Sequence, residues 1–185
     1  MKLTPGMIQD LKSVARLSSR NNWEYAGKLD VRPKGSKLVY RGITRQTSKC
    51  KDTVEGAVLQ GPVTYHTHPC TLEGFHTTLP SDADFRVFIK GFPHLWTNII
   101  CDRDGFYMVQ LTDPEALPLP KAVEDTMADL RLDPFMWVRR VSHEGAEYFR
   151  TDLDEWTEFV NDDFHPRMMD QFGISVSYQG YINVR

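Results

Sequence analysis

The sequence predicts an α+β or a mixed-sheet α/β fold, in which helices and β-hairpins are mixed without a regular order. Near the N-terminus, apolar side chains fall on one face at helical spacing: Met7, Ile8, Leu11, Val14 and Ala15. A D-R-D-G turn at residues 102–105 separates two strand-like runs and is typical of a β-hairpin. Elsewhere the expected strands and helices do not alternate as β-α-β units. These three observations leave the α+β and mixed-sheet α/β classes as alternatives.

The composition is that of a soluble globular protein with a single core. The chain has 185 residues, of which 41% are apolar and 25% are charged. The formal net charge is −3, and basic and acidic residues are mixed along the chain. Because there is no long basic run, we expect no nucleic-acid partner. No apolar run approaches the roughly 18 residues that a membrane span needs, so we expect no membrane partner.

The cysteines favour an intracellular, cytoplasmic protein. Cys50, Cys70 and Cys101 are odd in number and unrelated in spacing, and no C-x-x-C pair predicts a structural zinc site. They are typical of reduced thiols in a reducing compartment. The first twelve residues also lack the apolar centre of a secretory signal.

The first half of the chain is expected to begin with a helix and to continue mainly as strands. Thr4 is the candidate N-cap of that helix, Pro5 suits its first turn, and residues 18–22 break the pattern. The expected elements that follow are a strand over 23–31, a turn over 32–35, a strand over 36–43, a loop over 44–53, a strand ending at 66, a long loop over 69–80, a helix over 81–92 that ends near Gly91, and strands over 95–101 and 106–111.

From about residue 113 the chain changes character, and an α+β C-terminal extension is expected. It is predicted to contain a short helix with Val123, Met127 and Leu130 on its apolar face, a hairpin over 135–141 and 147–151 that turns at 143–145, a helix over 152–164 and a strand over 174–178. We therefore expect residues 1–185 to form a single domain, with a motif-bearing core over about 20–112 and the extension over about 113–185.

The extension contains several large aromatic residues: Trp137, Trp156, Phe159, Phe164 and Tyr178. The first interpretation is that they pack the extension onto the core, because large apolar side chains are more often buried than exposed. The alternative is that some of them line a surface for a protein partner.

Two histidines end the strand in the segment V-T-Y-H-T-H-P, residues 63–69. Side chains alternate along a strand, so His66 and His68 are expected on one face and Thr67 on the other. Two imidazoles on one face are a good start for a transition-metal site. Catalytic zinc needs a third protein ligand, however, and a lone H-x-H pair is more often a packed or hydrogen-bonded pair.

The segment L-P-S-D-A-D-F supplies the carboxylate candidates. Ser81 and Asp84 have the spacing of a helix capping box, which would explain both residues without any metal. The two interpretations are compatible, because a helix that starts here would present Asp84 in its first turn toward the end of the histidine strand. Asp82 is the competing carboxylate and ranks second.

His66-Thr67-His68-Pro69 followed by Ser81-x-x-Asp84 resembles the JAMM motif of the MPN-domain zinc metallopeptidases, the family of the JAMM-type deubiquitinases. The family also has an upstream glutamate in a segment of the form E-x-x-G-x-L. Residues 24–29, E-Y-A-G-K-L, match this form in type, order and approximate position. The resemblance covers about residues 20–112. It implies an α/β fold with a mixed sheet flanked by helices, similar to MPN domains and cytidine deaminases.

The resemblance implies a role for each of these residues. His66, His68 and Asp84 would bind one zinc ion per chain, Glu24 would be the general base, and Ser81 would help to stabilise the oxyanion. The activity implied is hydrolysis of an isopeptide or peptide bond, in a ubiquitin or ubiquitin-like conjugate or in a peptide substrate.

The chain departs from the family in the loop between the second histidine and the serine, which is longer than usual. Residues 69–80 bring Cys70, Glu73 and His76 near the expected site, where we expect no ligand role because three ligands are already supplied. Loop closure becomes only slowly less favourable with length, so the metal site can tolerate the insertion. We expect this loop to act as a lid or as a wall that determines specificity.

Other metal folds fit the sequence less well. An amidohydrolase barrel needs roughly 250 residues, and the H-x-H-x-D-H pattern of zinc β-lactamases fails at Cys70 and Thr71. An iron oxygenase with two histidines and one carboxylate has no use for Glu24 or Ser81. A non-catalytic MPN scaffold that assembles with other proteins is the remaining alternative.

Overall fold

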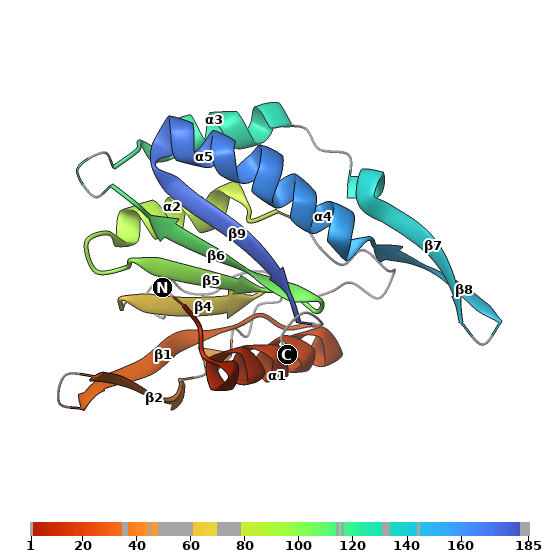
Figure 1. Ribbon diagram of the computed structural model, residues 1–185, viewed down its shortest axis with the longest axis horizontal. Helices are drawn as coiled ribbons and strands as arrows, with labels where there is room; N and C mark the ends of the chain where they lie inside the picture. The colour runs from red at the N-terminus through yellow and green to blue at the C-terminus, as the bar shows by residue number, and fades with distance from the viewer. Residues whose placement is uncertain are drawn as a thin grey trace.

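The computed structural model describes residues 2–34, 37–44, 46–47, 61–69, 79–113, 115, 117–130, 134–143 and 145–181. Figure 1 shows a mixed β-sheet with helices on both faces. The strand order in the sheet is β2-β1-β4-β5-β6-β9, and the short β3 also pairs with β1. β4 and β5 are parallel, whereas the other neighbours in this order are antiparallel. The predicted mixed α/β class with flanking helices is confirmed.

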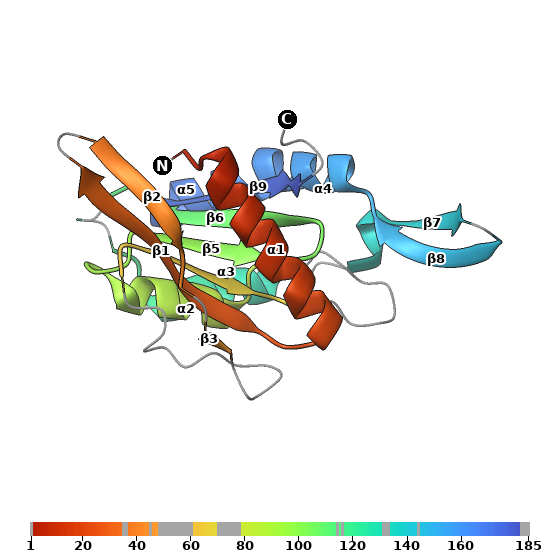
Figure 2. The same ribbon diagram turned by 90° about the horizontal axis from the view of Figure 1, so that it is seen from below.

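Helix α1 (Pro5–Asn21) covers one face of the sheet, as Figure 2 shows. Its N-cap is Thr4, as predicted, and Thr4 accepts a hydrogen bond from the Met7 backbone N–H. The helix continues to Asn21, so residues 18–21, where a break was expected, are still helical; the next residue, Asn22, has a left-handed backbone conformation and is the C-cap. The predicted apolar face is buried against strands of the sheet.

The first strands begin shortly after α1 and are antiparallel, and the second and third of them both pair with the first. They are β1 (Tyr25–Lys34), β2 (Lys37–Ile43) and β3 (Gln46–Thr47). The turn predicted over 32–35 is wrong for its first three residues, because Arg32, Pro33 and Lys34 continue β1 and pair with β2. Pro33 has no backbone N–H to donate to the sheet, and this loss is tolerated because Pro33 lies near the end of β1.

The central part of the sheet contains the β-α-β crossover that carries the histidine motif. Its elements are β4 (Val63–Thr67), α2 (Asp82–Gly91), β5 (Thr97–Cys101) and β6 (Gly105–Leu111). β5 and β6 form the hairpin that the D-R-D-G turn predicts. Ser81 is the N-cap of α2, also as predicted.

The C-terminal part supplies helices for the second face and one edge strand. Its elements are α3 (Pro120–Leu130), the 3₁₀-helix η2 (Pro134–Trp137), the hairpin β7 (Val138–His143) and β8 (Ala146–Thr151), α4 (Leu153–Phe159), the π-helix η3 (Val160–Phe164), α5 (His165–Phe172) and β9 (Ile174–Gly180). The hairpin β7–β8 projects away from the sheet in both views.

Two predicted boundaries in this part are wrong. Residues 135–137 belong to η2 and do not extend the hairpin strand. The helix predicted to end at 164 continues through η3 into α5, up to Phe172. Pro166 explains why the sequence suggested an end here, since proline removes a helical hydrogen bond. The widened π turn immediately before it accommodates the proline in the first turn of α5.

Each face of the sheet has its own apolar core. On the α1 face, Leu11, Tyr65 and Ile99 are fully buried. On the other face, residues of α2 and the central strands pack against aromatic side chains of the C-terminal part: Trp137, Trp156, Phe164 and Tyr178, with the partly buried Phe159 beside them. These aromatic side chains therefore pack the C-terminal part onto the core, as the first interpretation expects. Within the part of the chain described above, no helix has both the length and the apolar character needed to cross a membrane.

Candidate metal centre

The candidate site lies at the carboxyl end of β4, next to the end of its parallel neighbour β5. The N-terminus of α2 returns to this end of β4. β1 is antiparallel to β4, so β1 begins here and brings residue 24 to the same edge. Ligands in open α/β sheets commonly bind outside the carboxyl ends of the parallel strands. The topology thus gathers the motif residues at one place.

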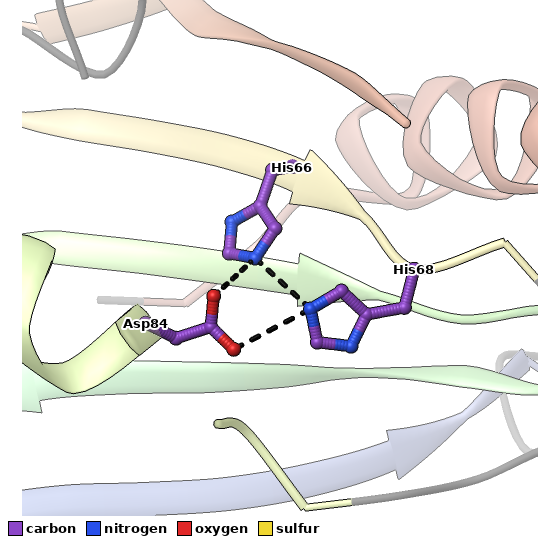
Figure 3. A group of neighbouring side chains, drawn as sticks. All are labelled: His66, His68 and Asp84. Carbon is purple, nitrogen blue, oxygen red and sulfur yellow. Dashed lines mark hydrogen bonds and ion pairs between the residues drawn. The ribbon is translucent and has the colours of Figure 1, made fainter. Parts of the chain in front are cut away.

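Figure 3 shows three side chains pointing toward one another: His66, His68 and Asp84. The Nε2 atoms of His66 and His68 are 3.2 Å apart. Asp84 Oδ1 is 2.9 Å from His66 Nε2, and Asp84 Oδ2 is 3.4 Å from His68 Nε2. Of the residues that the structure describes, only these form a group able to hold a metal ion, with ligand atoms within 4.8 Å of one another.

The spacing of these atoms suits a tetrahedral metal ion. Metal–ligand distances near 2.1 Å place the ligands of a tetrahedral zinc ion about 3.4 Å from one another. The separations of 2.9, 3.2 and 3.4 Å lie at or somewhat below this value. Two imidazoles and one carboxylate are a ligand set of catalytic zinc, and they leave a fourth position open. The same donors also suit iron(II).

Asp84 is held in place by the capping box that the sequence predicts. The Ser81 backbone N–H donates to Asp84 Oδ2 at 2.7 Å, and the Ser81 hydroxyl donates to the same oxygen at 2.8 Å. The Asp84 backbone N–H donates to Ser81 Oγ at 3.2 Å. Asp82, the competing carboxylate, is exposed and lies 3.5 Å from Arg86. The same hydrogen bonds that start α2 therefore orient Asp84 toward the histidines.

The charges in the group stabilise one another. Burial raises the pKa of Asp84, but His66 and His68 outweigh burial and hold that pKa well below its usual value. Burial lowers the pKa of His68, while Asp84, together with Glu24 and Asp102, outweighs burial and leaves the pKa raised. The Asp84 carboxylate is thus held in its ionised form beside the two imidazoles. His66 Nδ1 is buried and has no hydrogen-bond partner among the described residues.

Glu24 lies next to this group, in the half-buried position just before β1. Its charge contributes to the raised pKa of His68, so its carboxylate acts on the same imidazole as Asp84. It is not one of the three residues whose ligand atoms converge. Ser81, the last predicted site residue, is exposed at the start of α2. The structure therefore brings Glu24, Ser81 and the three ligand candidates to one edge of the sheet.

Asp102 is a neighbour of the site that sequence reasoning missed. The β4–β5 register pairs Thr67 with Cys101, so His68 and Asp102 follow side by side and face the same way. The Asp102 carboxylate accepts from the backbone N–H groups of Asp104 and Gly105, while its Oδ2 has no hydrogen-bond partner among the described residues. Burial raises the pKa of Asp102 to about 7, against these hydrogen bonds. The D-R-D-G turn predicts a hairpin but not the position of Asp102 beside His68. That position depends on the pairing of β4 with β5, which are distant in sequence.

The loop predicted to act as a lid falls outside the described residues from 70 to 78, and so do Cys70, Glu73 and His76. Its role stays a prediction. Cys101 is a free, buried cysteine, and burial raises the pKa of its thiol.

The chain matches no known protein-family model, and neither a curated protein nor a solved structure matches it. What the site can do therefore follows from its geometry and its donor chemistry. The resemblance to the MPN-domain peptidases stays a prediction.

Proposed function

We propose that this protein is a zinc-dependent hydrolase of JAMM type that cleaves an isopeptide or peptide bond, in a ubiquitin-like conjugate or a peptide, inside the cell. The observation that carries the proposal is the convergence of His66 Nε2, His68 Nε2 and an Asp84 oxygen within 4.8 Å. Glu24 and Ser81 at the same edge add the two polar groups that such a hydrolase needs besides its metal.

The ligand candidates would hold one zinc ion, which when bound supplies Lewis acidity and lowers the pKa of a coordinated water toward about 7. Glu24 would accept a proton from the attacking water and pass it to the leaving amine. Glu24 is half-buried just before β1, and its charge acts on the His68 imidazole, so its carboxylate lies close enough to the ligand candidates for this role.

Ser81 would donate a hydrogen bond to the oxyanion that forms at the scissile carbonyl. Its hydroxyl proton is directed at Asp84 Oδ2, at 2.8 Å, so the hydroxyl must rotate to serve the substrate. Its backbone N–H also donates to Asp84 Oδ2, at 2.7 Å, and can hold the carboxylate while the hydroxyl turns.

Metal analysis of protein purified without added metal tests the proposal against its alternatives. We expect about one zinc per chain, the number that one ligand set can hold. Iron in its place would favour an oxygenase with two histidines and one carboxylate. Absence of any metal, also after incubation with zinc, would favour a non-catalytic scaffold.

The variant Glu24→Gln tests the role of the base. The substitution is nearly isosteric and leaves the three ligand candidates in place, so zinc content and folding should be unchanged. We expect kcat to fall on the order of 10²-fold or more, the usual scale for a general acid–base group. Turnover close to that of the wild type would remove Glu24 from the mechanism.

A further inference from the structure

A chain of buried hydroxyl groups lies behind the histidine strand, on the face opposite the metal centre. Thr67, between the two histidines, points away from them, as strand alternation predicts. Its hydroxyl donates to Ser18 Oγ of α1 at 2.8 Å, and the Ser18 hydroxyl donates to the Trp23 carbonyl at 2.6 Å. The Tyr25 backbone N–H donates to Thr67 Oγ1 at 2.9 Å. Ser18 and Thr67 both have 0% exposure.

These hydrogen bonds engage the backbone on both sides of Glu24. The Trp23 carbonyl belongs to the peptide group before Glu24, and the Tyr25 N–H belongs to the peptide group after it. Each peptide group is planar, so anchoring both of them restricts the two backbone dihedral angles of Glu24. The backbone around Glu24, the proposed base, is therefore linked by hydrogen bonds to Thr67, the residue between the two histidines.

The side-chain contact replaces sheet pairing at the point where the backbone ladder ends. The β1–β4 register ends at Ala26 and His66. Tyr25 would come next, and its N–H is satisfied by the Thr67 side chain. A hydroxyl can accept one hydrogen bond and donate another at once, which an aliphatic side chain of the same shape cannot do.

We propose that Thr67 and Ser18 are positioning residues, which hold the backbone of Glu24 at a fixed place relative to the metal ligands. This inference rests on the proposed function, because it assigns Glu24 the role of base. A shift of about 1 Å in a catalytic group can reduce turnover on the order of 10²-fold. Loss of the hydroxyl chain would thus lower kcat without removing any group that touches substrate or metal.

The test compares Thr67→Val and Ser18→Ala with two controls. Thr67→Val keeps the shape of the side chain but loses the hydroxyl, whereas Thr67→Ser keeps the hydroxyl and should rescue turnover. Thr64→Val is the matched control, because Thr64 is a fully buried threonine of the same strand whose hydroxyl donates to the Asn98 side chain. Ser18→Ala carries the test if Thr67→Val does not fold.

We expect full zinc content in each variant, a kcat reduced about tenfold or more in Thr67→Val and Ser18→Ala, and an unchanged KM. In a Glu24→Gln background, Thr67→Val should cause no further loss, because residues that act through one another are not additive. An equal loss in both backgrounds, or an equal loss in Thr64→Val, would overturn the inference.

Amide hydrogen exchange at Tyr25 gives a measurement that needs no activity. It should become faster in Thr67→Val and Ser18→Ala, and stay slow in Thr64→Val and Thr67→Ser. Unchanged exchange in Thr67→Val would overturn the inference even if kcat falls. If the zinc-loaded wild type cleaves no isopeptide or peptide substrate, the proposed function fails. The exchange rates then decide alone whether the hydroxyl chain fastens this segment.

Discussion

At the scale of single residues, Asp84 connects the start of a helix with the candidate metal ligands. One oxygen faces His66, and the other accepts from Ser81 and faces His68. Because both oxygens are engaged, the carboxylate has little freedom to turn, and less ordering entropy is lost when a metal binds. Its neighbour Asp82 has the same carboxylate group but points away from the histidines, since it lies next to Arg86 on the exposed side of α2.

Removal of one ligand candidate should abolish stable metal binding. We expect His66→Ala, His68→Ala and Asp84→Ala to lose most of their zinc, because the remaining two donors rarely hold the ion. Asp82→Ala is the matched control and should keep one zinc per chain. Metal content after gel filtration measures both. Zinc retained in Asp84→Ala and lost in Asp82→Ala would show that the other carboxylate is the ligand.

Asp102 should make the metal-free protein less stable as the pH rises. Its folded-state pKa is about 7, against a usual value of 3.8. Below pH 3.8 both states are protonated, whereas between that value and pH 7 only the unfolded state ionises, so stability falls as pH rises. Asp102→Asn, which stays neutral, should avoid this loss, which amounts to as much as about 4 kcal/mol. Urea unfolding of both metal-free proteins between pH 4.5 and 8 measures the difference. If the difference in unfolding free energy between the two proteins did not change with pH, the raised pKa of Asp102 would be contradicted.

At the scale of elements, the N-terminus of α2 stabilises its own helix and orients a ligand. Ser81→Ala should lower the free energy of unfolding by about 1 kcal/mol, the usual cost of a lost N-cap. It should also weaken zinc binding 10- to 100-fold, the usual effect of losing a group that orients a metal ligand.

Thr4→Ala is the matched control, since Thr4 is the N-cap of α1 and forms a capping box there. We expect a similar loss of stability and unchanged zinc affinity, measured by competition with a chromophoric chelator. Equal zinc affinity in both variants would show that the capping box does not orient Asp84.

Much of the site could be predicted from the sequence because its signals are local. Alternation along β4 predicts that His66 and His68 share a face, and the S-x-x-D spacing predicts the cap of α2. Asp102 could not be predicted, because only the pairing of two strands places it beside His68. The hydrogen bond of the Ser18 hydroxyl could not be predicted for the same reason, since its partner Thr67 is 49 residues away in sequence.

At the scale of the whole molecule, the C-terminal part is built into the fold. β9 pairs with β6 along its whole length and forms one edge of the sheet. The sequence predicted β9 as a strand but could not assign its partner, because pairing across more than sixty residues leaves no local pattern. The hairpin β7–β8 was predicted by its turn, whereas its separation from the main sheet was not.

A chain that ends at residue 113 should therefore fail to fold cooperatively. Among the residues that the structure describes, nine of the seventeen buried ones in the core on the α2 face come after this position, including Trp156 and Val176. Without them the apolar side chains of α2 and β6 would be exposed, and the free energy lost would exceed the 5–15 kcal/mol by which domains are usually stable. Circular dichroism and thermal unfolding of residues 1–113 test this, with the full chain as control. A sharp transition in the shorter chain would mean that the N-terminal part is a domain by itself.

The proposed catalysis depends on one zinc ion in the group of His66, His68 and Asp84. The most direct measurement is turnover of a lysine-linked ubiquitin-like substrate by metal-free protein, as zinc is added in known equivalents. We expect no turnover without zinc, a linear rise as zinc is added and a plateau at about one equivalent per chain. Turnover that is independent of zinc, or one bound equivalent of zinc without cleavage of an isopeptide or peptide bond, would contradict the proposal.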